Sequence, residues 1–143
     1  MNHGSCRFGL WRVAVDFNGD VVYRVSFQKT APEGVVPVQF TRFLAGKSFD
    51  FEPLKSAALA DGELYYKIYR AVSEIPYGET RTYAEIAETA GTHARVVGNA
   101  MARNPTPLIV PCHRVVSKDG LGGFTPDLEI KKELLAMENK NKR

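Results

Sequence analysis

The spacing of the apolar residues changes character near Ser56, and this change restricts the chain to a β-rich part followed by a helical part. Before it, residues 10–17 and 21–27 are rich in β-branched and aromatic side chains. The pair Asn18-Gly19 between them supplies the positive φ angles that a tight turn needs. These segments predict a β-hairpin over residues 10–27. A short helix is expected over residues 38–45, within an otherwise irregular stretch.

After Ser56 the apolar residues recur at helical spacing. Residues 61–73 place Leu64, Ile68 and Val72 on one face, together with Tyr65 and Tyr69, and so predict a helix. Thr82 and Glu85 have the spacing of a capping box, which predicts a helix that runs from there to Thr89.

A second helix is expected from about His93 to Arg103, because Asn104-Pro105-Thr106-Pro107 cannot continue it. Residues 108–110 are then expected to form a short buried strand or extended segment. The last helix is expected to open with Thr125 as its N-cap and Pro126 at its first position, and to end near Asn139. One side of it carries Lys131, Leu134, Leu135 and Glu138.

The composition allows one domain, or one domain with a small annex. The expected fold class is α/β, with a β-rich domain over residues 1–57 and a helical domain over residues 58–143. A net charge of +3 is compatible with a polyanionic partner but is weak evidence by itself. The chain has no apolar run of roughly 20 residues and no apolar signal core, so neither a membrane span nor secretion is expected. Two isolated cysteines suggest a reducing compartment.

Pro111-Cys112-His113-Arg114 places a thiol next to an imidazole, and such a neighbour promotes the nucleophilic thiolate. In an extended strand, however, successive side chains point to opposite faces. Either the chain bends at Pro111, or a water molecule relays the proton. For an arbitrary Cys-His pair, a buried structural cysteine beside a surface histidine is the more frequent situation.

The helix pair over residues 82–103 has the dimensions of a DNA-reading helix-turn-helix. On its second helix Val97, Ala100 and Met101 form an inward stripe. A second, small and polar face carries Arg95, Gly98, Asn99 and Ala102. A face without bulk lets the backbone approach a phosphate chain, and an arginine there can enter the base stack. An ordinary helical hairpin with a solvated face fits these residues equally well. Glu138 is either a surface carboxylate or, if it points inward, a partner for His113.

Five blocks together resemble one family, the O6-alkylguanine-DNA alkyltransferases. The blocks are Gly78-Glu79-Thr80-Arg81-Thr82-Tyr83, Ala94-Arg95-Val96-Val97-Gly98, Asn104-Pro105, Val110-Pro111-Cys112-His113-Arg114-Val115 and Leu134-Leu135-Ala136-Met137-Glu138. They follow the order and spacing of the family over roughly residues 64–138. The most specific is the cysteine block with Asn-Pro ahead of it.

The resemblance implies a role for each matching residue. Cys112 would accept the alkyl group, His113 would act through a water as its base, and Glu138 would orient the imidazole. Arg95 would fill the gap left by the extruded guanine, while Tyr83 would help rotate the 3′ phosphate and donate to the flipped base. The other implied DNA contacts are Thr82, Ala94, Gly98 and Asn99. The implied pocket and its supports are Met101, Asn104, Arg114, Val115, Ser117, Phe124 and Lys131.

The implied activity is DNA repair by single-turnover transfer of an alkyl group from O6-alkylguanine, and also from O4-alkylthymine, to Cys112. It requires base flipping in double-stranded DNA and no cofactor; with Cys6 the only cysteine in the N-terminal part, no metal is implied. A monomer in the cytoplasm, or in the nucleus of a eukaryote, is expected. Two alternatives stay open: a non-catalytic relative that recruits repair factors, and a Cys-His hydrolase unrelated to DNA. The sequence departs from the family at Val96, where alanine is usual, and at Phe124, where tyrosine is common.

Overall fold

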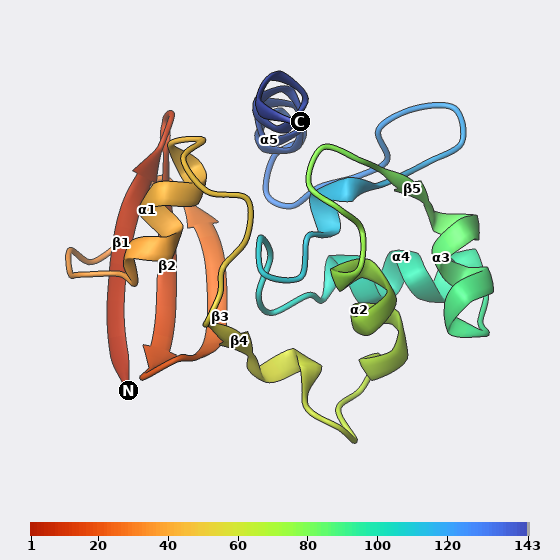
Figure 1. Ribbon diagram of the computed structural model, residues 1–143, viewed down its shortest axis with the longest axis horizontal. Coiled ribbons are helices and arrows are strands. Elements are labelled where there is room, and N and C mark those ends of the chain that lie inside the picture. Colours follow the sequence, from red (N-terminus) through yellow and green to blue (C-terminus); the bar gives the residue numbers. More distant parts are fainter. Residues whose placement is uncertain (143) are drawn as a thin grey trace.

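The computed structural model describes residues 1–142 and places an N-terminal β-sheet beside a helical part (Figure 1). The sheet has the order β1-β2-β3-β4. Its strands are β1 (Asn2–Phe8), β2 (Trp11–Asn18), β3 (Val21–Gln28) and the short β4 (Lys55–Ser56). β1, β2 and β3 are antiparallel neighbours, whereas β4 pairs parallel to β3. The predicted hairpin is therefore confirmed as β2 and β3.

The sequence gives little sign of β1, because Asn2–Phe8 contains no alternating apolar pattern. β1 nevertheless pairs with β2 across a two-residue turn at Gly9 and Leu10, so the two strands form a hairpin. β1 runs along the whole of β2, and the loop at Gly34 and Val35 presses against it. A Cβ atom on Gly4 would lie 2.3 Å from the carbonyl oxygen of Val35, so only glycine fits at this crossing.

Helix α1 (Val38–Leu44) matches the predicted short helix and lies against one face of the sheet. Phe40 and Phe43 on its inner side are completely buried. Both rings contact Phe51, with centroid separations of 4.9 and 4.7 Å. These aromatic contacts attach the irregular stretch before β4 to the core of the sheet.

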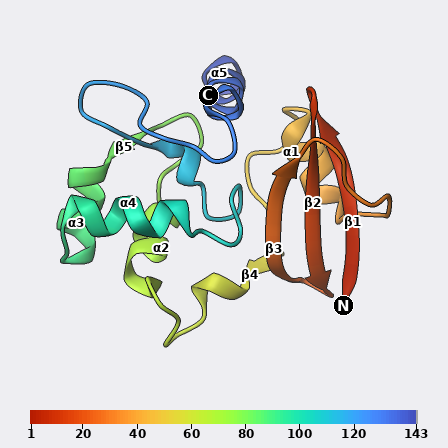
Figure 2. The same cartoon turned by 180° about the vertical axis from the view of Figure 1, so that it is seen from behind.

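The helical part follows β4. Figures 1 and 2 show its helices grouped on the β3 side of the sheet. In chain order it contains η1 (Ala57–Leu59), α2 (Tyr66–Ser73), β5 (Arg81–Thr82), α3 (Tyr83–Ala90), α4 (Ala94–Ala102), η2 (Cys112–Arg114), β6 (Val115–Val116) and α5 (Leu128–Asn141). β5 and β6 form a separate, parallel two-stranded sheet. No helix within residues 1–142 combines the length and apolar character needed to cross a membrane.

The predicted helix pair is present within one residue of its expected ends. Thr82 and Glu85 form the capping box at the start of α3, each side chain bonding the other's backbone N–H. Gly91 ends the helix in the left-handed conformation, with φ at 73°. His93 then precedes α4, where Val97 and Ala100 face inward as predicted.

Three predicted elements are wrong in position or type. α2 begins at Tyr66 rather than at residue 61, because Tyr65 adopts a left-handed backbone conformation that cannot continue a helix, and Leu64 is 71% exposed. α5 begins at Leu128, with Asp127 rather than Thr125 as its cap. Residues 108–110 form a turn instead of a strand, since Leu108 has a φ angle of 81°.

Helix α5 connects the two parts of the molecule. In both views it lies between the sheet and the helical part, at one end of the molecule. Its Ile130 and Leu134 belong to the apolar cluster of the N-terminal sheet, as does Leu108. A second cluster is formed among α2, α3, α4 and the segment before β6. The core of the first 57 residues is thus completed by side chains from the far end of the chain.

We expect Leu134→Ala to lower the free energy of unfolding by about 2 to 5 kcal/mol, because Leu134 is fully buried where α5 meets the sheet. The matched control is Leu10→Ala, since Leu10 is 83% exposed and should change stability by less than about 0.5 kcal/mol. Urea unfolding of both variants measures the difference. Equal, small losses would mean that α5 does not complete the core of the sheet.

Candidate active site

The loop that leads to Cys112 is held closed by Asn104. The side-chain nitrogen of Asn104 donates to the carbonyl oxygen of Val110 at 2.9 Å, and its oxygen accepts from the N–H of Thr106 at 3.0 Å. One amide thus joins the two ends of the loop. Asn104 is thus placed where it can hold the loop, and its role in the reaction stays a prediction.

The same loop is attached to the N-terminal sheet. The N–H of Val25 in β3 donates to the carbonyl oxygen of Pro105 at 2.8 Å. The hydroxyls of Ser56 and Thr106 form a buried hydrogen bond beside it. Because hydrogen bonds between buried groups are costly to break, the sheet fixes the position from which the loop turns toward Cys112.

Cys112 opens the short turn η2 and contributes to the wall of a cavity of about 450 Å³. Six predicted site residues line this cavity: Tyr83, Gly98, Met101, Asn104, Cys112 and Phe124. The opposite wall comes from β3, where Arg24 and Ser26 were not predicted as site residues. Nothing in the local pattern of a hairpin strand could have identified them, since their contact with the cavity depends on how the sheet packs against the loop.

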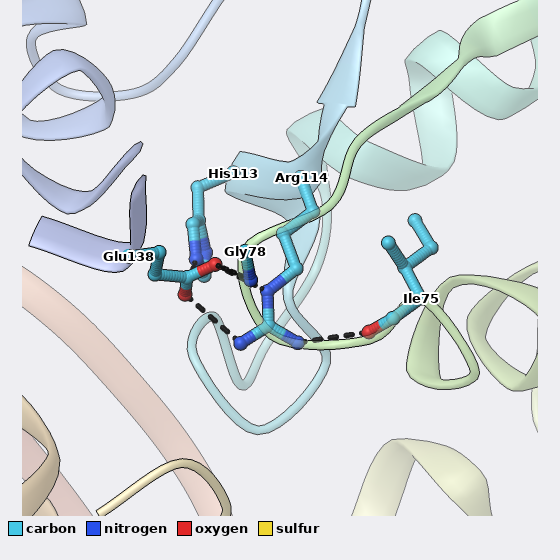
Figure 3. A network of polar contacts seen from close by, with 5 residues as sticks. All are labelled: Ile75, Gly78, His113, Arg114 and Glu138. Carbon is cyan, nitrogen blue, oxygen red and sulfur yellow. Dashed lines mark hydrogen bonds and ion pairs between the residues drawn. The ribbon is translucent and has the colours of Figure 1, made fainter. Parts of the chain in front are cut away.

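The two residues after Cys112 in the chain, His113 and Arg114, form a buried network with the carboxylate of Glu138 (Figure 3). His113 Nε2 lies 2.6 Å from Glu138 Oε2. Arg114 donates from Nε to Oε1 at 2.8 Å and from Nη2 to Oε2 at 2.9 Å. The N–H of Gly78 donates to Oε1 at 3.2 Å. Glu138 therefore points inward, as the pairing with His113 required.

The contacts of Glu138 explain its ionisation. Burial alone would raise its pKa, but hydrogen bonds from His113 and Arg114 and the charges of these partners outweigh that effect. The pKa of Glu138 is consequently lowered to about 2. The carboxylate is thus charged at neutral pH although only 1% of the residue is exposed.

The chain bends at Cys112, and this bend determines the directions of the Cys112 and His113 side chains. Residues 112–114 form a 3₁₀ turn rather than a strand, so the rule of alternating faces does not apply. His113 is completely buried and is not a surface histidine. Its Nδ1 has no hydrogen-bond partner among residues 1–142, whereas Nε2 faces Glu138.

Burial shifts the proton affinities of both groups. It lowers the pKa of His113, an effect that Glu138 opposes and that the charges of Arg114 and Lys131 reinforce. It raises the pKa of the Cys112 thiol, although Asn104 and the ammonium of Lys131 act in the other direction. The resting state is therefore a protonated thiol near a neutral imidazole.

Lys131 supports the other side of the site. Its Nζ donates to the carbonyl oxygens of Val115 at 2.7 Å and of Gly123 at 3.2 Å, so it joins β6 to the following loop. Burial lowers its pKa to about 8. Ser117 forms an isolated bridge with Gly120 in that loop, and the ring of Phe124 contacts Phe27 edge-on.

The predicted DNA contacts lie mainly on the outer face of α4. Ala94, Arg95 and Asn99 are exposed, and Gly98 is half-buried. Arg95 forms no hydrogen bond or ion pair within the described chain. Thr82 is occupied as the cap of α3. No group of three or more His, Cys, Asp or Glu side chains in residues 1–142 is arranged to hold a metal ion.

Comparison with known proteins identifies the family. Residues 63–140 match the model described as the DNA-binding domain of 6-O-methylguanine DNA methyltransferase. Because the match covers more than half of the chain, the chain belongs to this family.

Similar proteins cover most of the chain. A methylated-DNA–protein-cysteine methyltransferase of Methanopyrus kandleri is 46% identical over 97 residues, which are 68% of this chain and 73% of that protein. The methylated-DNA–protein-cysteine methyltransferase of Sulfolobus acidocaldarius is 39% identical over 103 residues. These residues are 72% of this chain but only 65% of that protein. The solved structure of Mycobacterium tuberculosis OGT in complex with DNA has a TM-score of 0.82, with 27% identity over 99% of this chain and 94% of that one.

We expect Glu138→Gln to change how stability depends on pH. The carboxylate's pKa of about 2 lies below its ordinary value of 4.5, so its stabilisation is complete above pH 4.5 and is lost as the pH falls toward 2. At neutral pH the wild type should be more stable than the variant by about 3 kcal/mol. This gap should narrow as the pH falls through that interval.

Denaturant unfolding at a series of pH values measures the gap. Glu129→Gln is the control, because Glu129 is an exposed residue of the same helix. Parallel curves for the wild type and Glu138→Gln would show that the carboxylate is not a principal ionic contact of the core.

Proposed function

We propose that this protein repairs DNA by taking the alkyl group from O6 of a damaged guanine and keeping it on Cys112. The observation that carries the proposal is the position of Cys112. It lines a cavity beside α4 and Tyr83, and the next residue in the chain, His113, forms a buried pair with Glu138. Membership of the family supports the same activity, as do its named relatives.

The chemistry begins with removal of the thiol proton. In the neutral imidazole Nε2–H donates a hydrogen bond to Glu138, which leaves the lone pair of His113 on Nδ1. Through a water molecule this nitrogen takes the proton of Cys112. The sulfur then attacks the alkyl carbon, a C–S bond forms, and the bonding electrons of the C–O bond move to guanine.

Guanine leaves as a neutral base once it has gained a proton, and Tyr83 is the donor we assign. Burial raises the pKa of its hydroxyl, despite a hydrogen bond with the Gly123 backbone, so the group is protonated when the base arrives. The product on Cys112 is a thioether, which has no activated carbonyl for water to attack. Each protein molecule therefore acts once, and no cofactor takes part.

The substrate is double-stranded DNA, approached through its minor groove by α4. The exposed, small side chains of this helix allow close contact with the backbone. In the proposal Ala94, Gly98, Asn99, Thr82 and Tyr83 contact the DNA, and Arg95 enters the stack in place of the flipped base. The base then occupies the cavity that Met101 and Phe124 line. Val115 and Ser117 are not among the lining residues, and their proposed contribution is through backbone groups. O4-alkylthymine is the second substrate proposed for this pocket.

The proposal includes the wider organisation of the protein. Residues 1–57 form a β-rich domain, and residues 58–143 form the DNA-binding and catalytic domain. The protein works as a monomer in the cytoplasm, where its thiol stays reduced. It requires no metal ion.

Cys112→Ala should abolish transfer while binding to alkylated DNA stays largely intact, because phosphate contacts dominate such an interface. The wild type should gain the mass of one methyl group, on the peptide that contains Cys112, after mixing with a duplex carrying O6-methylguanine. Cys6→Ala is the matched control and should still gain that mass. Binding without any mass gain in the wild type would identify a non-catalytic reader of damaged DNA.

Arg95→Ala should slow repair of duplex DNA much more than reaction with free O6-benzylguanine. The free base has no stack to leave, so the flipping cost of about a few kcal/mol is absent. Single-turnover rates on both substrates measure the effect, with Arg42→Ala, which lies on the exposed side of α1, as the control. Equal losses on the two substrates would remove Arg95 from the flipping step.

A further inference from the structure

Arg114 is the member of the buried network that the transfer chemistry does not use. We propose that Arg114 sets the proton affinity of His113 by balancing the charge of Glu138, so that the imidazole stays neutral and can accept the thiol proton. This inference rests on the proposed function for its catalytic consequence. Its electrostatic part concerns the free protein alone.

The geometry gives Arg114 little freedom. Two of its nitrogens bond the two oxygens of Glu138, and its Nη1 donates to the carbonyl oxygen of Ile75 at 2.9 Å (Figure 3). Its guanidinium carbon lies 5.4 Å from the centre of the Tyr77 ring. A planar fork in bidentate contact with a carboxylate is the arrangement for which arginine is suited and lysine is not.

The charges around His113 explain why this pairing matters. From α5 the imidazole is bonded to Glu138 and feels the charge of Lys131, and from its own turn it feels the charge of Arg114. A lone buried carboxylate at 2.6 Å would draw a proton onto the ring. Arg114 is bonded to both oxygens of the same carboxylate, so the Arg114–Glu138 pair is electrically neutral. This neutral pair attracts a proton to the ring much less than a lone carboxylate would. Lys131 acts in the same direction, but it is bonded to Val115 and Gly123 instead of the carboxylate.

The consequence for transfer follows from counting protons on the Cys112–His113 pair. The protons that matter are those on the Cys112 sulfur and on Nδ1 of His113. The pair is reactive when these two atoms hold one proton between them, because Nδ1 is then free to take the proton of the thiol. With two protons the thiol is blocked, since its acceptor is already charged. Loss of the positive charge of Arg114 raises the proton affinity of both groups and moves the acid limb of the rate profile to higher pH.

A purely structural role for Arg114 makes a different prediction. If the guanidinium only joins α5 to the turn at Ile75, its loss should lower stability and reduce transfer at every pH. The acid limb would then stay where it is in the wild type. The position of that limb and the titration of His113 therefore separate the two roles.

The experiment compares Arg114→Met, Arg114→Lys and the double variant Arg114→Met/Glu138→Gln with the wild type. The His113 ring is titrated by NMR in protein labelled at histidine, without DNA, and the single-turnover rate is measured against pH. Arg42→Met controls for the loss of one exposed charge. The double variant removes both members of a buried ion pair, a change that proteins often tolerate better than the loss of one.

In Arg114→Met the His113 pKa should rise, and transfer at pH 7 should fall by about tenfold or more as the acid limb moves past that pH. Arg114→Lys keeps the charge and should retain a His113 pKa nearer that of the wild type. The double variant should return it toward the wild-type value, because the carboxylate that attracts the proton is gone as well. Arg42→Met should match the wild type.

An unchanged His113 titration in Arg114→Met would overturn the inference. If that variant does not fold, Glu138→Gln and the double variant decide the matter. Glu138→Gln retains the positive charge of Arg114, so its His113 should titrate at lower pH than in the double variant, and equal titrations would refute charge balance. A wild type that never gains a methyl group would instead contradict the proposed function, while the titrations would still test Arg114.

Discussion

Glu138 carries a negative charge where water hardly reaches it, and two other segments of the chain converge on α5 to stabilise that charge. His113 and Arg114 approach from the turn after Pro111, and the N–H of Gly78 approaches from the loop before β5. Because an unpaired buried charge would cost several kcal/mol, these segments and α5 cannot separate without a large penalty. The same carboxylate orients the imidazole. Stability and chemistry therefore depend on one ionic contact.

The N-terminal sheet has a direct part in the site, although it supplies no predicted catalytic residue. It holds the loop before Cys112 through Val25 and Ser56, and β3 forms one wall of the cavity. In return, Ile130 and Leu134 of α5 complete the apolar core of the sheet. Glu138 follows Ile130 and Leu134 at four-residue spacing on the same face of α5, so the packing of this face against the sheet also positions the carboxylate.

Proton affinities in the site follow from burial and from the pairing of charges. The thiol and the imidazole are both driven toward their neutral forms by burial, and cations on either side adjust that balance. Arg114 is committed to the carboxylate, whereas Lys131 is bonded to backbone carbonyls near the cavity. The two cations therefore have different effects: one limits the attraction of Glu138 for protons, and the other favours a negative sulfur.

Local chemistry in the sequence was enough to predict the β2–β3 hairpin, the capping box of Thr82 and Glu85, and the cysteine segment, because each depends on neighbours within a few positions. The start of α2, the pairing of β1 and the turn at Leu108 were not predictable in this way. β1 joins the sheet through a tight turn although its sequence lacks an alternating apolar pattern, and the other two features depend on left-handed backbone conformations at Tyr65 and Leu108 that the spacing of apolar residues does not reveal. The sequence by itself determined which side chains could carry the reaction. Only the tertiary structure decided that Glu138 faces inward, that Arg114 shares its carboxylate with His113, and that β3 closes the cavity, since burial and long-range packing assign these contacts.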